Sequence, residues 1–558
     1  MTHIAPRNAL GFSLATILVG APLSCGVDGS PPGADGSSSA GGTSNASEGS
    51  NPDGSAGESE GGDSSGVPDG PWLPGIASTL HPGLPNGEPV ACEWDWFIGH
   101  LFFQRNDAQP DAHSPRRMYS ASCDTDTSTP RLFTSLTIGS KVDSGLGGVS
   151  GVITVSTLDP ATGAVVVDET HHFPECRSMH GIATASDCGT VAALCRISNT
   201  ANDADHDAVA TGPDPEWMTN ENICGNEDKM NDHMWLYEWP DGDLSQDPVK
   251  VIVHKSIGSW EYGSNYLRYA EADDSYGIAL KTTVGEKDVG SGCHEADTFL
   301  ILNREDYQYA PENERGWVWA CATGHTIHNR PAYDPTTNKY AMLCSTDWND
   351  QETQGLNEIA FRLEDGPKNV VHYATGGSIR IKGGAGPLVP REGGGFLGLL
   401  VGEPTMTEDP EYTSPTQIGL VTLDATGEQE GEIRWYPNDG IGFYGWPQLG
   451  PLGNGRYLLA WGEGYQAGTA DNNGDRNAAL VLPQTFWMME IDEGGNPLTS
   501  QTEVSEAGWG ETNEMIPLGA GRVAWSFIPD DRKDLATGTY PHCNQDLVHY
   551  VYTSSTQP

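Results

Sequence analysis

Two kinds of β-hairpin alternate along residues 71–558, and this alternation constrains the fold more than any other feature of the chain. The first kind is an apolar strand that runs into an acidic turn, as at residues 359–366 and 487–494. The second kind is a Gly- or Asp-containing turn that leads into a strand of small apolar residues, as at 453–461 and 519–527. Each kind occurs six times, mostly 55 to 70 residues apart. Short β-rich runs separated by such turns are typical of an all-β protein.

Two hairpins per repeat make a four-stranded unit, and several such units arranged radially form a β-propeller. We therefore predict a single propeller of six or seven four-stranded blades over residues 71–558. Residues 92–103 and the strand at 547–553 would complete one blade by pairing the start of the domain with its end. Two β-sandwiches would not require strict alternation, and the repeat is too long for a β-helix rung. The resemblance is to propellers in general: no WD40, kelch or NHL signature is present, so it implies no activity.

The first 24 residues read as a signal peptide. Arg7 precedes an apolar run at 9–21, which is too short to span a bilayer. The sequence Pro-Leu-Ser-Cys-Gly at 22–26 resembles the lipobox of bacterial lipoproteins, although Pro22 and Leu23 depart from its commonest form. This resemblance implies that Cys25 is acylated and becomes the mature N-terminus. The alternative is ordinary cleavage without a lipid, which would give a secreted protein.

Residues 25–70 comprise the predicted anchor cysteine, Cys25, and the linker that follows it. After Cys25 the segment is rich in Gly, Ser, Asp and Glu and contains no aromatic residue, Lys or Arg. Such a composition cannot bury enough apolar surface to offset the entropy of ordering, so we expect disorder and a root-mean-square span of about 35–40 Å. We thus expect a cell-envelope protein, lipid-anchored to the outer membrane and facing the periplasm or the surface.

The cysteine content agrees with export. The chain has 11 Cys, and ten remain when the anchor cysteine is set aside. An even number outside the cytoplasm predicts up to five disulfides. Pairing of neighbours in sequence would give Cys92–Cys123, Cys195–Cys224 and Cys321–Cys344.

Charge narrows the range of partners. The formal net charge is −48, from 29 basic and 77 acidic residues. Nucleic acid is therefore excluded as a partner, and membrane contact is expected through the lipid anchor alone. Cations, neutral glycans and basic peptides remain possible partners. The simplest explanation of the charge is solubility in a saline medium.

A ligand site is expected at one mouth of the propeller channel, where the connections into the innermost strands gather. Projecting the repeat onto the fold places His180, Tyr266, Asn329, Gly384 and Trp446 around the axis. The segments there are rich in Gly and aromatic residues, which suit close backbone approach and the flat face of a sugar or side chain. The predicted ligand contacts are Trp260, Tyr262, Tyr266, Asn329, Tyr444, Trp446, Trp509 and Asn513. The alternative is that these aromatics only pack between blades.

Two metal sites are further hypotheses. His180, His325 and His328 would bind a transition metal if they meet at the axis. The alternative is that each histidine is a hydrogen-bonded structural residue. Asp471, Asn473 and Asp475 place oxygen ligands as the start of a calcium loop would, but the Glu that completes an EF-hand is missing.

Enzyme signatures are mostly absent. The chain has no GxSxG elbow, HExxH helix or phosphate-binding loop of the Walker type. Glu511 and Glu514 are candidates for a catalytic carboxylate pair. The sequence therefore favours a module that binds glycan or peptide through the propeller mouth. The alternative is a secreted propeller enzyme, either dependent on a metal at the axial histidines or acting as a glycoside hydrolase or lyase.

Overall fold

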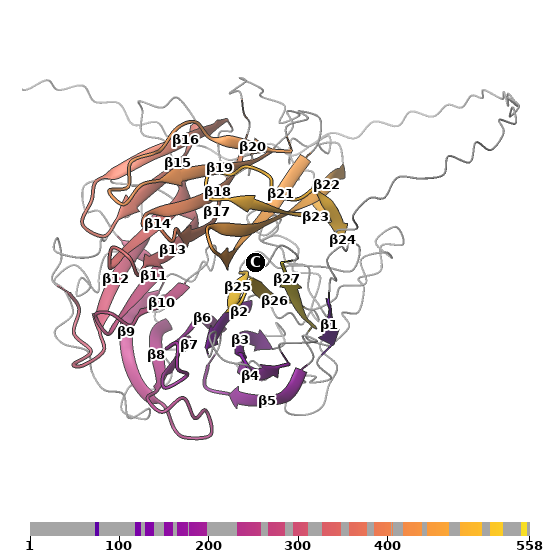
Figure 1. Ribbon diagram of the computed structural model, residues 1–558. Coiled ribbons are helices and arrows are strands. Elements are labelled where there is room, and N and C mark those ends of the chain that lie inside the picture. Colours follow the sequence, from indigo (N-terminus) through magenta and orange to yellow (C-terminus); the bar gives the residue numbers. More distant parts are fainter. Residues whose placement is uncertain are drawn as a thin grey trace, which may run out of the picture. The chain divides into compact units, whose positions relative to one another are not determined.

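The computed structural model shows an all-β protein whose antiparallel sheets form the seven blades of a β-propeller (Figure 1). All the described strands lie in one compact unit, residues 65–558. The structure describes residues 73–77, 118–123, 129–138, 150–159, 165–176, 178–197, 232–257, 266–284, 294–310, 326–346, 356–375, 384–402, 404, 417–437, 443–467, 480–504, 514–527 and 548–554. Within these ranges no helix is long and apolar enough to cross a membrane.

The strands of blades 1 to 6 follow chain order from the axis outwards, and blade 7 does so except that its outermost strand is β1. Blades 1 and 2 consist of β2 (Met118–Cys123), β3 (Arg131–Ile138), β4 (Ser150–Leu158) and β5 (Val165–Phe173), then β6 (Ser178–Thr184), β7 (Val191–Ile197), β8 (Asp232–Trp239) and β9 (Val249–Ile257). Blade 3 consists of β10 (Tyr266–Ala270), β11 (Ser275–Val284) and β12 (His294–Asn303). An isolated bridge from Leu302 to Tyr309 stands where its fourth strand would be.

Blades 4 to 7 follow the same plan. Blade 4 consists of β13 (Thr326–Asp334), β14 (Lys339–Thr346), β15 (Leu356–Leu363) and β16 (Lys368–Thr375). Blade 5 consists of β17 (Gly384–Pro390), β18 (Phe396–Gly402), β19 (Gln417–Leu423) and β20 (Arg434–Tyr436). Blade 6 consists of β21 (Phe443–Gly453), β22 (Arg456–Ala467), β23 (Leu480–Asp492) and β24 (Thr502–Val504). Blade 7 consists of β25 (Ile516–Gly519), β26 (Arg522–Phe527), β27 (Val548–Thr553) and β1 (Leu73–Ala77).

The fold confirms the predicted propeller and sets the number of blades at seven. The predicted Gly- or Asp-containing turns join the first and second strands of blades 2 to 7, and the predicted acidic turns follow third strands. Blade 7 is closed as expected by pairing the start of the domain with its end, because β1 pairs with β27 from Leu73↔Val551 to Ala77↔Val548. The strand that closes it is residues 73–77, and the expected partner, 92–103, lies outside the described residues.

The acidic turns have a local structural cause. Aspartates in them accept hydrogen bonds from backbone N–H groups two to four residues ahead, which fixes the turn. Asp243 accepts from Ser245 N at 2.9 Å, and Asp424 accepts from Thr426 N at 2.8 Å. The Ser245 hydroxyl lowers the pKa of Asp243, and the Thr426 hydroxyl lowers that of Asp424. Part of the negative charge of the chain therefore belongs to its turns.

A buried polar network joins the last blade to the first. The ring of His549 in β27 lies between two serines, with Nδ1 2.8 Å from Ser526 Oγ and Nε2 2.8 Å from Ser156 Oγ. Thr134 Oγ1 lies 3.1 Å from Ser526 Oγ and continues the network into β3 of blade 1. Burial lowers the pKa of His549 to about 4, so the ring is neutral at pH 7.

Acidification is expected to weaken this junction. The pKa of His549 is lower in the folded chain than in the unfolded chain, so the unfolded chain binds more protons between about pH 6.5 and pH 4. The stabilisation is complete above that window and falls by about 2 to 3 kcal/mol as pH drops through it. Urea unfolding at pH 7.5 and pH 4.5 measures the loss. His549→Gln, which does not titrate, should lose less stability than the wild type on acidification; equal losses would contradict the assignment.

Candidate functional site

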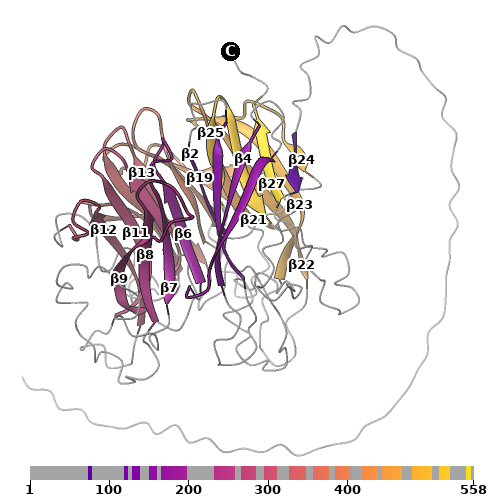
Figure 2. The same ribbon diagram turned by 90° about the horizontal axis from the view of Figure 1, so that it is seen from below.

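Seven inner strands surround the axis of the propeller: β2, β6, β10, β13, β17, β21 and β25 (Figure 1). Each contacts the next, and β25 contacts β2, so the ring is closed. The strands of each blade run up and down between two faces (Figure 2). Because the sheets are antiparallel, every inner strand begins at the same face, which we call the mouth. Every turn between a first and a second strand lies at the opposite face.

The inner strands are irregular near the mouth. The strand register shifts between Met179 and Ile182 in β6 and between Ala385 and Leu388 in β17. It also shifts between Gly445 and Gln448 in β21 and near the start of β13. Bulges of this kind redirect side chains and are frequent beside functional sites. Four of the seven inner strands therefore depart from regular pairing at the same end.

An arginine–glutamate ion pair crosses the centre of the ring. Arg268 of β10 donates from Nη2 to Oε1 of Glu514, just before β25, at 2.5 Å. Blades 3 and 7 are not neighbours, so this pair spans the axis. The guanidinium is also held by blade 4, because its Nε donates to the carbonyl of Pro331 at 3.0 Å. The two side chains are 22% and 13% exposed, which leaves both in contact with solvent.

A second arginine lies against the same group of residues. Arg330 of β13 places its guanidinium carbon 4.9 Å from the centre of the Tyr266 ring, and Arg268 places its own 5.6 Å from that centre. The Tyr266 ring also packs edge-on against Tyr119 of blade 1, with ring centres 5.3 Å apart. We call Arg268, Arg330, Tyr266 and Glu514 the axial cluster. It combines two cations, one carboxylate and one aromatic ring drawn from blades 3, 4 and 7.

A glycine in β6 permits this packing. Gly181 has φ +83°, and a Cβ there would lie 2.7 Å from the backbone nitrogen of Leu267. A side chain at this position would therefore push β10 away. His180, the neighbour of Gly181, is buried in the same bulge.

The predicted site residues fall into three groups. Tyr266, Asn329, His180 and Glu514 lie at or beside the mouth ends of inner strands, with described side chains. Tyr266 is buried beneath the arginines, so its ring supports them. Gly384, Tyr444, Trp446 and His328 lie on inner strands β17, β21 and β13, but only their backbones are described. Outside the described residues lie Trp260, Tyr262, Trp509, Asn513, Glu511, His325, Asp471, Asn473, Asp475 and Cys25. Their binding, catalytic, metal and lipid roles stay predictions.

The arginines of the axial cluster were missed by sequence reasoning. The sequence patterns of aromatics, histidines and carboxylates do not include Arg268 or Arg330. The sequence did contain a signal for these arginines, because the chain has only 29 basic residues and these two lie next to the predicted site residues Tyr266 and Asn329.

Within the described ranges, no group of three His, Cys, Asp or Glu residues could hold a metal ion.

Two disulfides replace expected pairings. Cys123 at the end of β2 is bonded to Cys188 in the turn after β6, and Cys176 is bonded to Cys195 in β7. The expected pairs Cys92–Cys123 and Cys195–Cys224 are therefore wrong. The reason is the repeat: a separation of 65 residues, about one blade, brings Cys123 beside Cys188 in the next blade. Cys344 is also disulfide-bonded, so its predicted pairing with Cys321 stays open.

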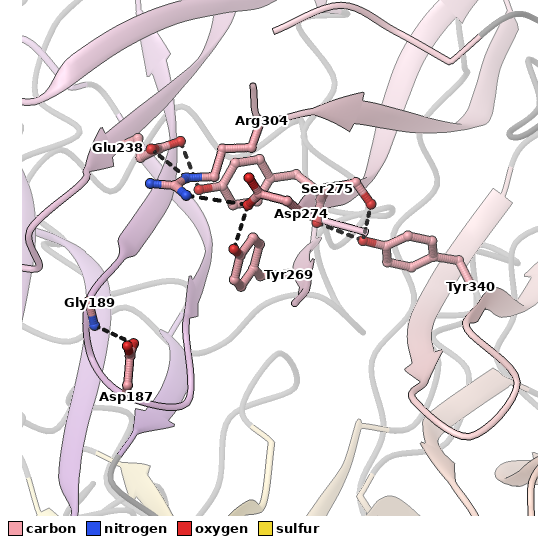
Figure 3. Close-up of polar contacts among 9 residues, drawn as sticks. Asp187, Gly189, Glu238, Tyr269, Asp274, Ser275, Arg304 and Tyr340 are labelled. Atoms are coloured by element: carbon pink, nitrogen blue, oxygen red, sulfur yellow. Dashed lines mark hydrogen bonds and ion pairs between the residues drawn. The ribbon is translucent and has the colours of Figure 1, made fainter. Parts of the chain in front are cut away.

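A second polar cluster lies at the face opposite the mouth (Figure 3). Glu238 of β8 is buried, and its two oxygens accept from Arg304 Nε at 2.8 Å and from the Tyr276 hydroxyl at 2.8 Å. Arg304 also contacts Asp274 at 3.3 Å, and Asp274 accepts from the Tyr269 hydroxyl at 2.6 Å. Burial raises the pKa of Tyr276 well above its usual value, so its hydroxyl stays protonated. This cluster joins blades 2 and 3 and has a structural role.

Comparisons with known proteins assign no function to this chain. No protein-family model and no curated protein matches the sequence. A protein of unknown function from Dyadobacter fermentans is 11% identical, with 67% of this chain and 94% of that chain covered and a TM-score of 0.33. A thermostable family-43 glycoside hydrolase is 12% identical, with 53% and 92% covered and a TM-score of 0.30. The NanB sialidase of Streptococcus pneumoniae is 9% identical, with 68% of each chain covered and a TM-score of 0.37.

Proposed function

We propose that this protein is a binding module that takes a glycan or a peptide at the mouth of the propeller channel. The observation that carries the proposal is the axial cluster, in which three blades direct charged side chains of both signs to the centre of one ring. Arg268 and Glu514 keep partial contact with solvent while Arg268 is fixed by a backbone carbonyl. Fixed polar groups in an otherwise apolar surrounding are what orients a ligand.

Binding is expected to depend on both members of the ion pair. Arg268→Gln should weaken the binding of ligands found on glycan and peptide arrays by about tenfold or more, because it removes a charged hydrogen-bonding partner, and Glu514→Gln should change their affinity severalfold. The full chain, purified in detergent, serves for the arrays and for calorimetry on the ligands found. Arg434→Gln is a matched control, since Arg434 bonds Asn496 at the opposite face.

Two results would point elsewhere. If neither axial substitution changes the binding of any array ligand while both variants keep the wild-type melting temperature, the site does not lie at the axis. If a bound glycan is cleaved, and Glu514→Gln stops cleavage without weakening binding, the protein is an enzyme at this mouth.

We further propose that the domain is held at the cell envelope by a lipid on Cys25. The lipobox-like sequence and the charge-rich linker after it support the proposal. Cys25→Ser should move the protein from the membrane fraction to the soluble fraction, as blotting of fractionated cells would show. A Cys25→Ser protein that stays with the membrane would contradict lipid anchoring.

We also propose that Asp471, Asn473 and Asp475 bind calcium and that the bound ion stabilises the mouth. Removal of calcium by a chelator should then lower the melting temperature of the wild type. The triple alanine variant should not respond, and an equal response of both proteins would argue against these ligands.

A further inference from the structure

The charge of the axial cluster has the opposite sign to that of the whole chain. Arg268 and Arg330 supply two positive charges and Glu514 supplies one negative charge. The chain as a whole carries −48. The net charge of the chain attracts cations at long range. At the axial cluster itself, the two arginines would repel a cation. An anionic group, recognised at short range, fits the cluster better.

The two guanidinium groups are arranged for such a group. Their guanidinium carbons lie 5.6 and 4.9 Å from the centre of the same Tyr266 ring, although they come from different blades. Arg330 is only 5% exposed. Arg268 is fixed by Pro331 O on Nε and by Leu267 O on Nη1 at 3.2 Å, which leaves Nη2 for a carboxylate. Arginine presents a planar set of donors that matches a carboxylate, and little entropy is lost when those donors are already held.

Glu514 shows which chemistry suits this position. Its carboxylate accepts from Arg268 Nη2 at 2.5 Å across the axis. Two cations sharing one ring repel each other, and a carboxylate between blades 3 and 7 reduces that repulsion. A carboxylate on a ligand would offer Arg268 the same chemistry from the solvent side.

On these grounds we propose that the ligand of the axial cluster carries a carboxylate, which takes the place of the Glu514 carboxylate on Arg268 next to Arg330. This inference rests on the proposed function and specifies its ligand class. Among carboxylates, a sugar acid is the class that agrees with the glycan of the proposed function and with a strand, β21, whose backbone brings Tyr444 and Trp446 to its mouth end. We therefore assign the site to a uronic-acid oligosaccharide.

The test compares each acid with its neutral ester. A panel of galacturonate and glucuronate oligosaccharides and their methyl esters is titrated calorimetrically into the full chain. The expected result is that at least one acid binds about tenfold or more tightly than its ester, because the ester lacks the charge. Arg268→Gln should remove that preference. Glu514→Gln should strengthen binding of the acid severalfold, because the competing carboxylate is gone, and Arg434→Gln should change neither.

The outcomes separate this inference from the proposed function. Equal binding of acid and ester, both weakened by Arg268→Gln, would keep the binding module and overturn the carboxylate. Weaker binding of the acid by Glu514→Gln would overturn displacement of Glu514. Binding of no acid in the panel would also overturn the assignment. Binding only of peptides with a free C-terminal carboxylate, compared with amidated peptides, would overturn the sugar acid. The binding data for Arg268→Gln are interpreted only if its melting temperature matches that of the wild type. If it does not, the effect of Glu514→Gln on binding of the acid decides the inference.

Discussion

Replacement of Arg304 by methionine is expected to lower the free energy of unfolding by about 3 to 5 kcal/mol. Glu238, the partner of Arg304, has a side chain only 1% exposed. Without the guanidinium, its carboxylate in the cluster of Figure 3 would stay buried with neutral hydroxyl donors from Tyr276 and Tyr307 in place of a cation. A buried charge that has lost its partner is far more costly than an exposed one. Urea unfolding at pH 7 measures the change.

A paired substitution separates charge burial from loss of packing. Glu238→Gln together with Arg304→Met removes both charges, so the double variant should be more stable than Arg304→Met alone. Lys339→Met is the matched control, because the Lys339–Asp365 pair is exposed and should contribute less than about 1 kcal/mol. A loss for Arg304→Met no greater than that of Lys339→Met would contradict the role given to the buried pair.

Removal of the Cys123–Cys188 disulfide is expected to cost about 4 kcal/mol. The bond closes a separation of 65 residues and joins blade 1 to blade 2. On the chain-entropy account, a loop of this length strongly restricts the unfolded chain. The double variant Cys123→Ala, Cys188→Ala, unfolded in urea beside the wild type, gives the cost.

Peptide mapping without reduction checks the bond itself. Tryptic peptides from the wild type should show Cys123 joined to Cys188. A link from Cys123 to Cys92 would contradict the structure. A wild type whose stability is unchanged by a reductant, with the bond shown to be reduced, would contradict the predicted cost.

The propeller could be predicted because its turns are determined by local sequence. Asp243, Asp424 and their equivalents fix tight turns through local hydrogen bonds, so turn and strand recur visibly in each repeat. The first hairpin of blade 1 was missed because the strand after its turn, Arg131–Ile138, carries Arg, Thr and Ser in place of a run of small apolar residues. The closing strand β1 was missed because its five residues include Pro74 and Gly75, which are poor strand signals.

The axial cluster and the disulfides could be predicted only in part. The repeat placed Tyr266 and Asn329 near the axis because their distance from a turn is a property of one blade. The ion pair of Arg268 with Glu514 depends on blades that are 246 residues apart in the chain, and no local pattern encodes that meeting. Cys123 and Cys188 pair for the same kind of reason, across neighbouring blades.

The most direct test of the axial site is hydrogen exchange of the full chain, alone and saturated with its tightest array ligand. We predict that exchange slows in β10, in β13 and at residues 514–518, and that the outer strands β16, β20 and β24 change little. Slower exchange confined to the outer strands, with β10 and β13 unchanged, would contradict a ligand site at the axis.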